Sequence, residues 1–404
     1  MKILFVSTMF PDEADPSRGV YNYELCRALA RQHDVRVVSP RLWTQAARRR
    51  LCGQRIERNE TEFGGLICSR PCYWYTPKML RSRYGAFYWH AIRGDIRRLE
   101  RDFQPDAVLS YWAHPDGEAA LKAARRMNVP HAVIVGGSDV LILPKEPARG
   151  EKVKRVLVNS DAVMTVSDGL QRNVIELGAA PESVHTIRQG IDPERFHPNR
   201  SRGLRERLNL PDDRPVLLWV GRMVDVKRLD LLVDACDRLR SGGRTFLLCL
   251  AGAGPEQAAV RQLVDERQLG DCVRFVGVVG HDDLPDWYRA ADATLLSSWS
   301  EGLPNVLRES LACGTPFVST DVGSIREIAD PRVSVLVQSG DAAGLAEGII
   351  RLLDGGYRTA AADYVARTWS ECAADVARLF QRLRGAPDEL HQSHRKSRPV
   401  PVPA

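Results

Sequence analysis

Residues 215–252 decide the fold, and they read PVLLWVGRMVDVKRLDLLVDACDRLRSGGRTFLLCLAG. The runs at 215–221 and 245–252 have the length of strands, and nearly every position in them is apolar. Between them, residues 229–239 place Leu and Val at helical spacing and predict a helix. Strands that are apolar on both faces are typical of parallel sheets covered by helices on both sides, so this stretch predicts an α/β fold.

The same alternation continues after residue 252. The further predicted elements are, in order, helix 256–267, strand 273–277, helix 283–290, strand 293–298, helix 305–312, strand 316–320, a short helix near 324–328, helix 342–353 and helix 361–383. Asp341 is the expected N-cap of the helix at 342–353. An alternation this regular is typical of a doubly wound sheet.

An earlier series of Val-rich strands precedes residue 188. Its predicted elements are, in order, strand 2–7, helix 21–32, strand 35–39, strand 106–112, helix 116–127, strand 131–137 and strand 161–167. Residues 188–203, RQGIDPERFHPNRSRG, have no periodic pattern and indicate a linker. Two such domains face to face form a cleft, and ligands of these sheets bind outside the carboxyl ends of the strands.

Length supports this division, because the 404 residues exceed the roughly 250–300 that one hydrophobic core holds. We expect an N-terminal Rossmann-like domain at 1–200 and a C-terminal Rossmann-like domain at 201–370. A helix at 371–385 is expected to pack back on the N-terminal domain. The polar, Pro-rich residues 386–404 are expected to be disordered.

Composition is that of a globular protein, with 44% hydrophobic residues, 27% charged residues and a formal net charge of +6. These values exclude a disordered or coiled-coil chain and do not indicate nucleic-acid binding. The nine Cys form no C-x-x-C pair, so no disulfide framework and no metal site are expected. The N-terminal run reads as a strand rather than a signal peptide, and no run reaches the roughly 18 apolar residues of a membrane span. A soluble, cytoplasmic protein is expected.

The most informative loop is 299–316, WSEGLPNVLRESLACGTP, which follows a predicted strand and begins a helix near Pro304. The backbone amides expected to point into the crevice are those of Gly302, Leu303, Asn305 and Val306. The helix dipole favours a negative group there. Glu301 and Glu309 bracket this turn and can accept hydrogen bonds from the hydroxyls of one ligand. Alternatively, one glutamate has a capping role and the other lies on a solvated face.

A second loop, VGRMVDVKRL at 220–229, follows a strand at the same edge of the predicted sheet. Arg222 and Lys227 are two cations in a loop that runs into a helix. Arg as a bidentate fork and Lys as a point charge can hold a diphosphate. The alternative is an ordinary pair of surface cations.

Together these segments resemble the retaining glycosyltransferases of family 4, which have the GT-B fold of two facing Rossmann-like domains. The resemblance rests on Glu301-GLPNVLR-Glu309, on VGR-x4-K at 220–227, on LAGAGPE at 250–256 and on the run 275–302. It covers 215–330 closely and the N-terminal half more loosely. The looser matches are ILFVSTMFP and RGVYNYELCRALA near the N-terminus, GGSD at 136–139, VMTVSDGL at 163–170 and IRQGIDPERFHP at 187–198.

The resemblance implies that the domain at 1–200 is the acceptor side and that the domain at 201–370 binds the nucleotide-sugar. It also implies roles for individual residues. Arg222 and Lys227 would hold the diphosphate of a nucleotide-sugar, Glu309 the ribose hydroxyls, and Glu301 the hydroxyls of the transferred sugar. The other donor-binding positions that it implies are Gly19, Val276, Gly302, Leu303, Pro304 and Asn305. The nucleotide-sugar is a substrate, no cofactor is implied, and no metal is expected because the two cations already neutralise the phosphates.

Family members usually carry a His near the sugar, after a strand of the N-terminal domain. In LSYWAHPDG at 109–117 the candidate is His114, as a catalytic residue or as a surface or hinge histidine. The family's frequent H-G-x-D appears here as GGSD, so a second His is absent and the role of Asp139 stays open.

The N-terminal half also carries basic and aromatic segments. Residues 41–58 contain six Arg and one acidic residue, and residues 72–99 combine aromatics with Arg. In helical register, apolar positions from Leu80 to Leu99 share one face, and Arg83, Arg93 and Arg97 share the other. The segment is interpreted either as a core helix with a solvated Arg face or as a surface for an anionic membrane, which would indicate a lipid-linked acceptor.

The predicted function is that of a retaining hexosyltransferase that moves a sugar from a nucleoside-diphosphate-sugar to a glycan or glycolipid acceptor in polysaccharide or cell-envelope biosynthesis. Preorganised cations and helix amides stabilise the departing diphosphate, so no protein nucleophile is required. Two alternatives remain: a nucleotide-sugar epimerase or hydrolase on the same fold, and a non-catalytic subunit that binds nucleotide-sugars.

Overall fold

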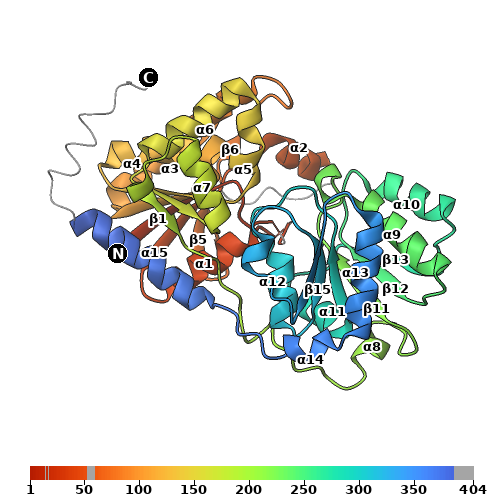
Figure 1. Ribbon diagram of the computed structural model, residues 1–404. Coiled ribbons are helices and arrows are strands. Elements are labelled where there is room, and N and C mark those ends of the chain that lie inside the picture. Colours follow the sequence, from red (N-terminus) through yellow and green to blue (C-terminus); the bar gives the residue numbers. More distant parts are fainter. Residues whose placement is uncertain (14, 17, 52–59, 386–404) are drawn as a thin grey trace. The chain divides into compact units, whose positions relative to one another are not determined.

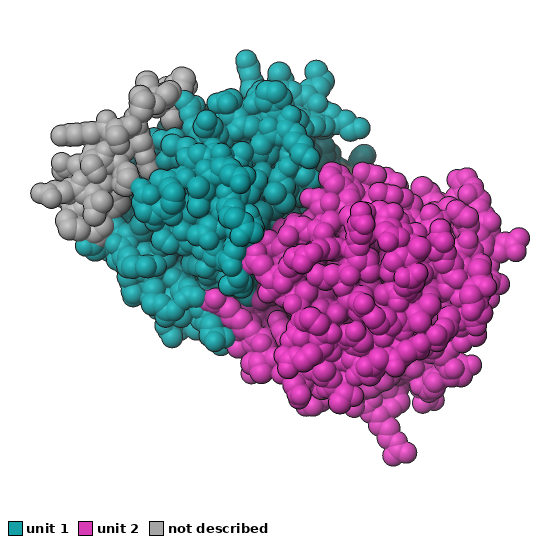
Figure 2. Space-filling view, viewed as in Figure 1, with its two compact units in different colours: residues 1–189, 369–404 teal, residues 190–368 magenta. Residues whose placement is uncertain are grey.

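The structure is a computed structural model that describes residues 1–13, 15–16, 18–51 and 60–385. The chain forms two compact units (Figure 2): unit 1 comprises residues 1–189 and 369–404, and unit 2 comprises residues 190–368. The sequence prediction had placed the first boundary at residue 200. The predicted disordered tail, residues 386–404, lies outside the described residues.

Within the described residues, unit 1 contains an eight-stranded sheet of order β10-β9-β8-β7-β1-β2-β5-β4, in which only β4 pairs in antiparallel fashion. Its strands are β1 (Lys2–Val6), β2 (Asp34–Val38), β4 (Glu60–Phe63), β5 (Leu66–Ser69), β7 (Ala107–Tyr111), β8 (His131–Val135), β9 (Ala162–Thr165) and β10 (Val184–Thr186), and a small second sheet pairs β3 (Arg41–Leu42) with β6 (Cys72–Tyr73). Its helices are α1 (Val20–Ala30), α2 (Trp43–Leu51), α3 (Tyr84–Asp102), α4 (Glu118–Met127), α5 (Ser138–Leu141), α6 (Pro147–Asn159), α7 (Asp168–Glu176) and α15 (Trp369–Gly385).

Unit 2 contains a six-stranded sheet of order β13-β12-β11-β14-β15-β16, with all pairs parallel. Its strands are β11 (Val216–Val220), β12 (Leu247–Ala251), β13 (Val273–Gly277), β14 (Ala293–Leu296), β15 (Phe317–Thr320) and β16 (Ser334–Val337). Its helices are α8 (Leu204–Arg207), α9 (Leu229–Ser241), α10 (Gln257–Glu266), α11 (Leu284–Ala290), α12 (Asn305–Ala312), α13 (Ala342–Asp354) and α14 (Tyr357–Ala361).

The central strand β11 explains why this sheet is covered on both faces. Leu217 and Trp219 pack in one core with α9, α10 and α13, whereas Val216, Leu218 and Val220 pack in a second core with α8, α11 and α12 (Figure 1). Successive residues of a strand point to opposite faces, so an unbroken apolar run fills both cores at once. The prediction of an α/β fold with doubly wound sheets is confirmed.

The predicted helix at 361–383 is wrong as a single element. Helix α14 ends at Ala361, and α15 begins only at Trp369. Between them, the N–H of Ile191 donates to the carbonyl of Arg367 at 2.7 Å, and Ile191 and Thr368 form an isolated parallel bridge. This pairing holds the chain extended, and α15 then packs on α1 within unit 1.

Helix α3 decides between the two interpretations of the segment 72–99, a core helix with a solvated Arg face or a membrane-binding surface. Its residues Tyr88, Ile92, Ile96 and Leu99 are buried in a core of unit 1. The arginines at 83, 93 and 97 are exposed. The apolar face of α3 is therefore part of the core and is not a membrane surface. No helix among the described residues has the length and apolarity needed to cross a bilayer.

Candidate functional site

Two loops at the carboxyl edge of the sheet in unit 2 lie against each other. β11 and β14 pair in parallel, so the loops that follow them leave the same edge. The N–H of Trp299 donates to the carbonyl of Val226 at 3.1 Å. The hydroxyl of Ser297 lies 2.9 Å from the carbonyl of Lys227 and 2.8 Å from that of Arg228. These bonds hold the Lys227 loop next to the loop that carries Glu301.

Lys227 and Glu301, both predicted from the sequence, are in direct contact. The Lys227 Nζ lies 2.6 Å from Glu301 Oε1, and the Ser298 hydroxyl donates to the same oxygen at 2.6 Å. The side chains of Lys227 and Glu301 are only 20% and 11% exposed. A charge-assisted bond that is partly shielded from water is stronger than a surface ion pair. Lys227 and Ser298 therefore orient the Glu301 carboxylate.

The helix that follows begins where the sequence predicted. Asn305 is the first residue of α12, and Pro304 is its N-cap. Leu303 and Pro304 are buried, whereas Gly302 and Asn305 are partly exposed. The carbonyl of Gly302 accepts a 3.1 Å hydrogen bond from the N–H of Ser324. The positive end of the α12 dipole thus lies directly after the Glu301 loop, where it favours an anion.

Glu309 is contacted by two side chains, one in α11 and one just before it. Its Oε2 accepts a 2.9 Å hydrogen bond from the hydroxyl of Tyr288, and its Oε1 lies 3.5 Å from Nε2 of His281. Burial, together with the adjacent Glu309 charge, raises the pKa of the Tyr288 hydroxyl well above its usual value. Tyr288 therefore remains a proton donor to Glu309. The sequence analysis missed Tyr288, His281 and Ser298, although the run HDDLPDWYRA contains the first two.

Arg222 follows β11 and is exposed. Its loop lies tightly against the next one: the N–H of Gly221 donates to the carbonyl of Ala251 at 3.0 Å. Gly252 has a φ of +141°, and a Cβ there would lie 1.8 Å from the carbonyl oxygen of Gly221. Only glycine fits this approach. Val276, expected to border the base, is partly buried near the end of β13 at the same edge of the sheet.

His114 lies in the interior of unit 1, not at its surface. It is 0% exposed; its Nδ1 lies 3.2 Å from Glu118 Oε2 and its Nε2 lies 3.1 Å from the carbonyl of Arg81. Both ring nitrogens face acceptors of unit 1. Of the two predicted alternatives, a surface histidine is wrong, because the ring is buried. A catalytic role for His114 is tested by none of these contacts and stays a prediction.

Asp139 and Gly19 also have local roles in unit 1. The Asp139 carboxylate accepts hydrogen bonds from the backbone N–H groups of residues 113, 136 and 137, at 3.0–3.1 Å. Burial raises its pKa to about 6. Gly19 has a φ of +68°, and a Cβ there would lie 2.3 Å from the carbonyl oxygen of Met9. The glycine is required for the approach of its own loop to the start of α1.

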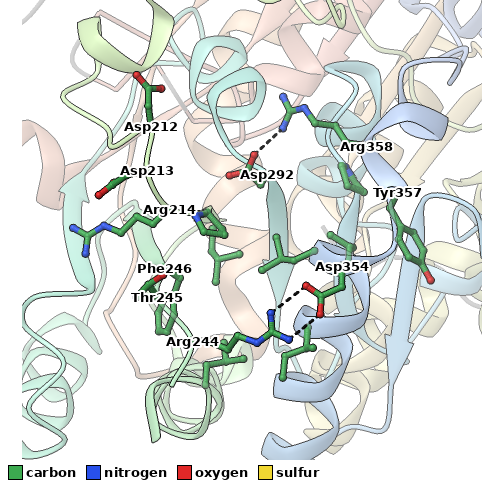
Figure 3. Close-up of a pocket in the computed structure, with 18 of the residues that line it drawn as sticks. Asp212, Asp213, Arg214, Arg244, Thr245, Phe246, Asp292, Asp354, Tyr357 and Arg358 are labelled. Atoms are coloured by element: carbon green, nitrogen blue, oxygen red, sulfur yellow. Dashed lines mark hydrogen bonds and ion pairs between the residues drawn. The ribbon is translucent and has the colours of Figure 1, made fainter. Parts of the chain in front are cut away.

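A pocket of about 610 Å³ lies at the opposite edge of the unit 2 sheet, where the strands begin (Figure 3). Arg244 pairs with Asp354 at 2.8 Å, and Asp292 lies 2.5 Å from Arg205 and 3.7 Å from Arg358. Arg205 and Arg358 also donate to backbone carbonyls at the end of α11. These charges stabilise helix ends, and the candidate site remains at the carboxyl edge. In the part of the chain that the structure describes, no group of His, Cys, Asp and Glu is arranged to hold a metal ion.

Two doubly wound units, with a Lys–Glu pair and a helix N-terminus at the carboxyl edge of one sheet, define the class of the GT-B glycosyltransferases. Residues 214–355 match the family described as Glycosyl transferases group 1, and residues 19–195 match Glycosyltransferase Family 4. The chain belongs to this family and is a glycosyltransferase that uses a nucleotide-sugar.

Its relatives include the putative teichuronic acid biosynthesis glycosyltransferase TuaC of Bacillus subtilis, which is 29% identical over 360 residues, 87% of this chain and 89% of TuaC. D-inositol 3-phosphate glycosyltransferase 2 of Catenulispora acidiphila is 33% identical over 325 residues, 72% of this chain and 75% of that protein. Among solved structures, HepE of Anabaena in complex with UDP-glucose has a TM-score of 0.66 at 18% identity and covers 97% of this chain and 100% of its own. At that identity the likeness shows the fold alone.

Proposed function

We propose that the protein is a retaining hexosyltransferase of polysaccharide or cell-envelope biosynthesis, which moves a sugar from a nucleoside-diphosphate-sugar to a glycan or glycolipid acceptor. The contact between Lys227 and Glu301 carries the proposal. In this contact the Lys227 ammonium lies beside the Glu301 carboxylate, which can accept hydrogen bonds from hydroxyl groups, and both lie next to the N-terminus of α12. A nucleotide-sugar has a diphosphate, which suits the lysine, joined directly to a hydroxyl-rich sugar, which suits the glutamate. The biosynthetic setting is supported by the relative named for teichuronic acid biosynthesis.

Arg222 and Lys227 bind the diphosphate in this proposal. As the glycosidic bond breaks, negative charge grows on the departing phosphate oxygens, and the sugar gains oxocarbenium character. Two cations and the amides at the start of α12 oppose that negative charge without rearranging during the reaction. The acceptor hydroxyl attacks from the leaving-group side and gives its proton to the departing phosphate, so the configuration is retained.

Glu301 and Glu309 bind hydroxyls rather than the diphosphate. Glu301 accepts hydrogen bonds from the transferred sugar, and Glu309 accepts them from the ribose. The two carboxylates are held by different side chains, which supports separate roles for them. Glu301 is oriented by Lys227 and Ser298, whereas Glu309 is oriented by Tyr288. Gly302, Leu303 and the other residues of the turn contribute backbone amides.

The test follows radiolabelled UDP-glucose and a panel of other nucleotide-sugars, with and without candidate glycan and glycolipid acceptors. We expect label in the acceptor, with the anomeric configuration of the donor, and slow donor loss without acceptor. Equal donor loss in the absence of acceptor indicates a hydrolase or epimerase instead. Donor binding without any turnover on the whole panel indicates a nucleotide-sugar-binding subunit.

The proposal includes a cytoplasmic location and peripheral contact with an anionic membrane that presents a lipid-linked acceptor. The apolar face of α3 is buried in the core, so we assign the membrane contact to exposed apolar residues of α2 and of the segment before α3. These residues are Leu51, Trp74, Met79 and Leu80. Basic residues 48–50 precede Leu51 on α2. Charge reversal at 48–50 should weaken sedimentation with anionic vesicles, and unchanged sedimentation refutes the membrane contact without affecting the transferase.

A further inference from the structure

The segment IDPERFHP at 191–198 resembles the family in sequence, but the proposed site assigns it no role. It begins unit 2, directly after the chain leaves unit 1 at residue 189. The ring of Phe196 lies 5.3 Å from the ring of His281 and 6.3 Å from the ring of Tyr288, measured between centroids. The segment therefore packs on the two residues whose side chains contact Glu309.

Backbone hydrogen bonds hold this segment in place. The N–H of Ile191 donates to the carbonyl of Arg367 at 2.7 Å, and the N–H of Arg195 donates to the carbonyl of Asp192 at 3.3 Å. The carbonyl of Arg195 in turn accepts a 3.1 Å hydrogen bond from Nη1 of Arg289. These bonds fix the part of the backbone from which the Arg195 side chain extends.

The Arg195 side chain determines which nitrogen of His281 carries the proton. Nη2 of Arg195 lies 2.9 Å from Nδ1 of His281. A guanidinium has donors and no acceptor, so Nδ1 must accept this hydrogen bond and cannot carry a proton itself. A neutral imidazole that accepts at Nδ1 has its N–H at Nε2. The contact therefore indicates the Nε2–H tautomer of His281.

The Nε2 atom of His281 faces Glu309, at 3.5 Å from Oε1, and the two side chains are only 21% and 11% exposed. The other carboxylate oxygen, Oε2, is held by Tyr288 at 2.9 Å. In the Nε2–H tautomer the ring presents a donor to the carboxylate, whereas in the other tautomer it would present a lone pair and repel it. Arg195 therefore determines whether His281 attracts Glu309.

Arg195 has a second partner, Asp282, which supplies a control. Nη2 of Arg195 also donates to Oδ1 of Asp282. The Asp282 side chain is 91% exposed and that of Arg195 is 22% exposed. An ion pair with a carboxylate this exposed contributes little. The contact of Arg195 with the shielded His281 ring is thus the one expected to matter for Glu309.

We propose that Arg195 and His281 are positioning residues for the nucleotide-sugar: Arg195 keeps the proton of His281 on Nε2, and His281 holds the Glu309 carboxylate for the ribose hydroxyls. The inference rests on the proposed function, which assigns Glu309 to the ribose. A carboxylate held by a donor on each oxygen keeps further lone pairs for the ribose and loses little freedom when it binds. Both residues act through Glu309, so they should affect donor affinity and KM rather than kcat.

The test measures binding of UDP, ADP and GDP to the full chain by calorimetry, and of the 2′,3′-dideoxy form of each, which lacks both ribose hydroxyls. His281→Asn keeps a polar group beside Arg195 but does not reach Glu309, whereas His281→Gln extends an amide N–H to the place of Nε2. For the nucleotide that wild type binds, we expect His281→Asn to weaken the ribose form about fivefold and to leave the dideoxy form unchanged. His281→Gln should restore most of the affinity.

Arg195→Met removes every donor of the arginine and keeps an unbranched side chain beside Phe196. It should weaken binding of the ribose form as much as His281→Asn does. Asp282→Asn, the matched control, removes only the exposed carboxylate charge beside Arg195 and should bind like wild type. Melting curves verify that each variant is folded, and if Arg195→Met does not fold, the comparison of the two His281 variants decides.

Three results overturn the inference alone, while the ribose form still binds to wild type. They are unchanged affinity in His281→Asn, an equal loss for the ribose and dideoxy forms, and an equal loss in His281→Asn and His281→Gln. The second result would indicate a residue that only supports the fold, and the third a role for the ring rather than its N–H. If wild type binds none of the three nucleotides, the proposed donor site fails, and the inference fails with it.

Discussion

Lys227 and Glu301 share one short contact, with Nζ 2.6 Å from Oε1, and Ser298 donates to the same carboxylate oxygen. The pair unites the loops after β11 and β14, which are 74 residues apart in sequence. A lysine has three donors, so the bond to Glu301 leaves others for a phosphate. The same contact therefore orients the carboxylate and places the cation.

Replacing Lys227 with Ala should reduce transfer roughly 10²–10³-fold, because a preorganised cation at the developing charge is lost. The measurement is initial transfer rate at saturating donor, with circular dichroism and a melting curve to verify folding. Arg244→Ala is the control, since Arg244 pairs with Asp354 at the opposite edge of the sheet. A rate for Lys227→Ala within twofold of wild type contradicts the assignment.

Tyr288→Phe tests the positioning of Glu309. Loss of the 2.9 Å bond leaves Oε2 of Glu309 without its donor, which should raise the KM for donor roughly tenfold, about 1.4 kcal/mol, with little change in kcat. A 2′-deoxyribose donor, which lacks a hydroxyl for Glu309, should be affected less by the substitution. Equal effects on both donors would indicate that Tyr288 is only a core residue.

The fold was largely predictable because its strands are continuous apolar runs. The run at 215–221 contains β11. Edge strand β16 was missed, because SVLV is four residues long and follows a polar loop. The break at 362–368 was missed for another reason: its pairing partner, Ile191, is more than 170 residues away in sequence and leaves no local pattern.

The site was predictable only in part. Charged residues in loops are conspicuous, so Lys227 and Glu301 could be found. Tyr288 reads as a core residue, and its ring is indeed buried, but its hydroxyl has a separate role that only the folded structure shows. His114 shows the opposite case. It is conspicuous in the sequence, but in the structure its two ring nitrogens face the Glu118 carboxylate and the Arg81 carbonyl.

Asp116→Asn should change the pH dependence of stability. Burial raises the pKa of Asp116 from 3.8 to about 6, so between these values the folded protein binds more protons than the unfolded chain. Wild-type stability contributed by this group therefore falls as pH rises from about 4 to 6, by up to about 3 kcal/mol, and Asn does not titrate. The melting temperature of the variant relative to wild type should rise across this window. A constant difference contradicts the raised pKa.

Gly252→Ala tests the close approach of the loops after β11 and β12. The added methyl would lie 1.8 Å from the Gly221 carbonyl oxygen at a φ of +141°, so the loop that carries Arg222 must move. We expect a melting temperature lower by at least about 2–4 °C and a higher KM for donor. Gly270→Ala is the matched control, since its Cβ would meet no atom within 4 Å and its φ is ordinary. If Gly252→Ala binds donor as tightly as Gly270→Ala, the position of Arg222 does not depend on this approach.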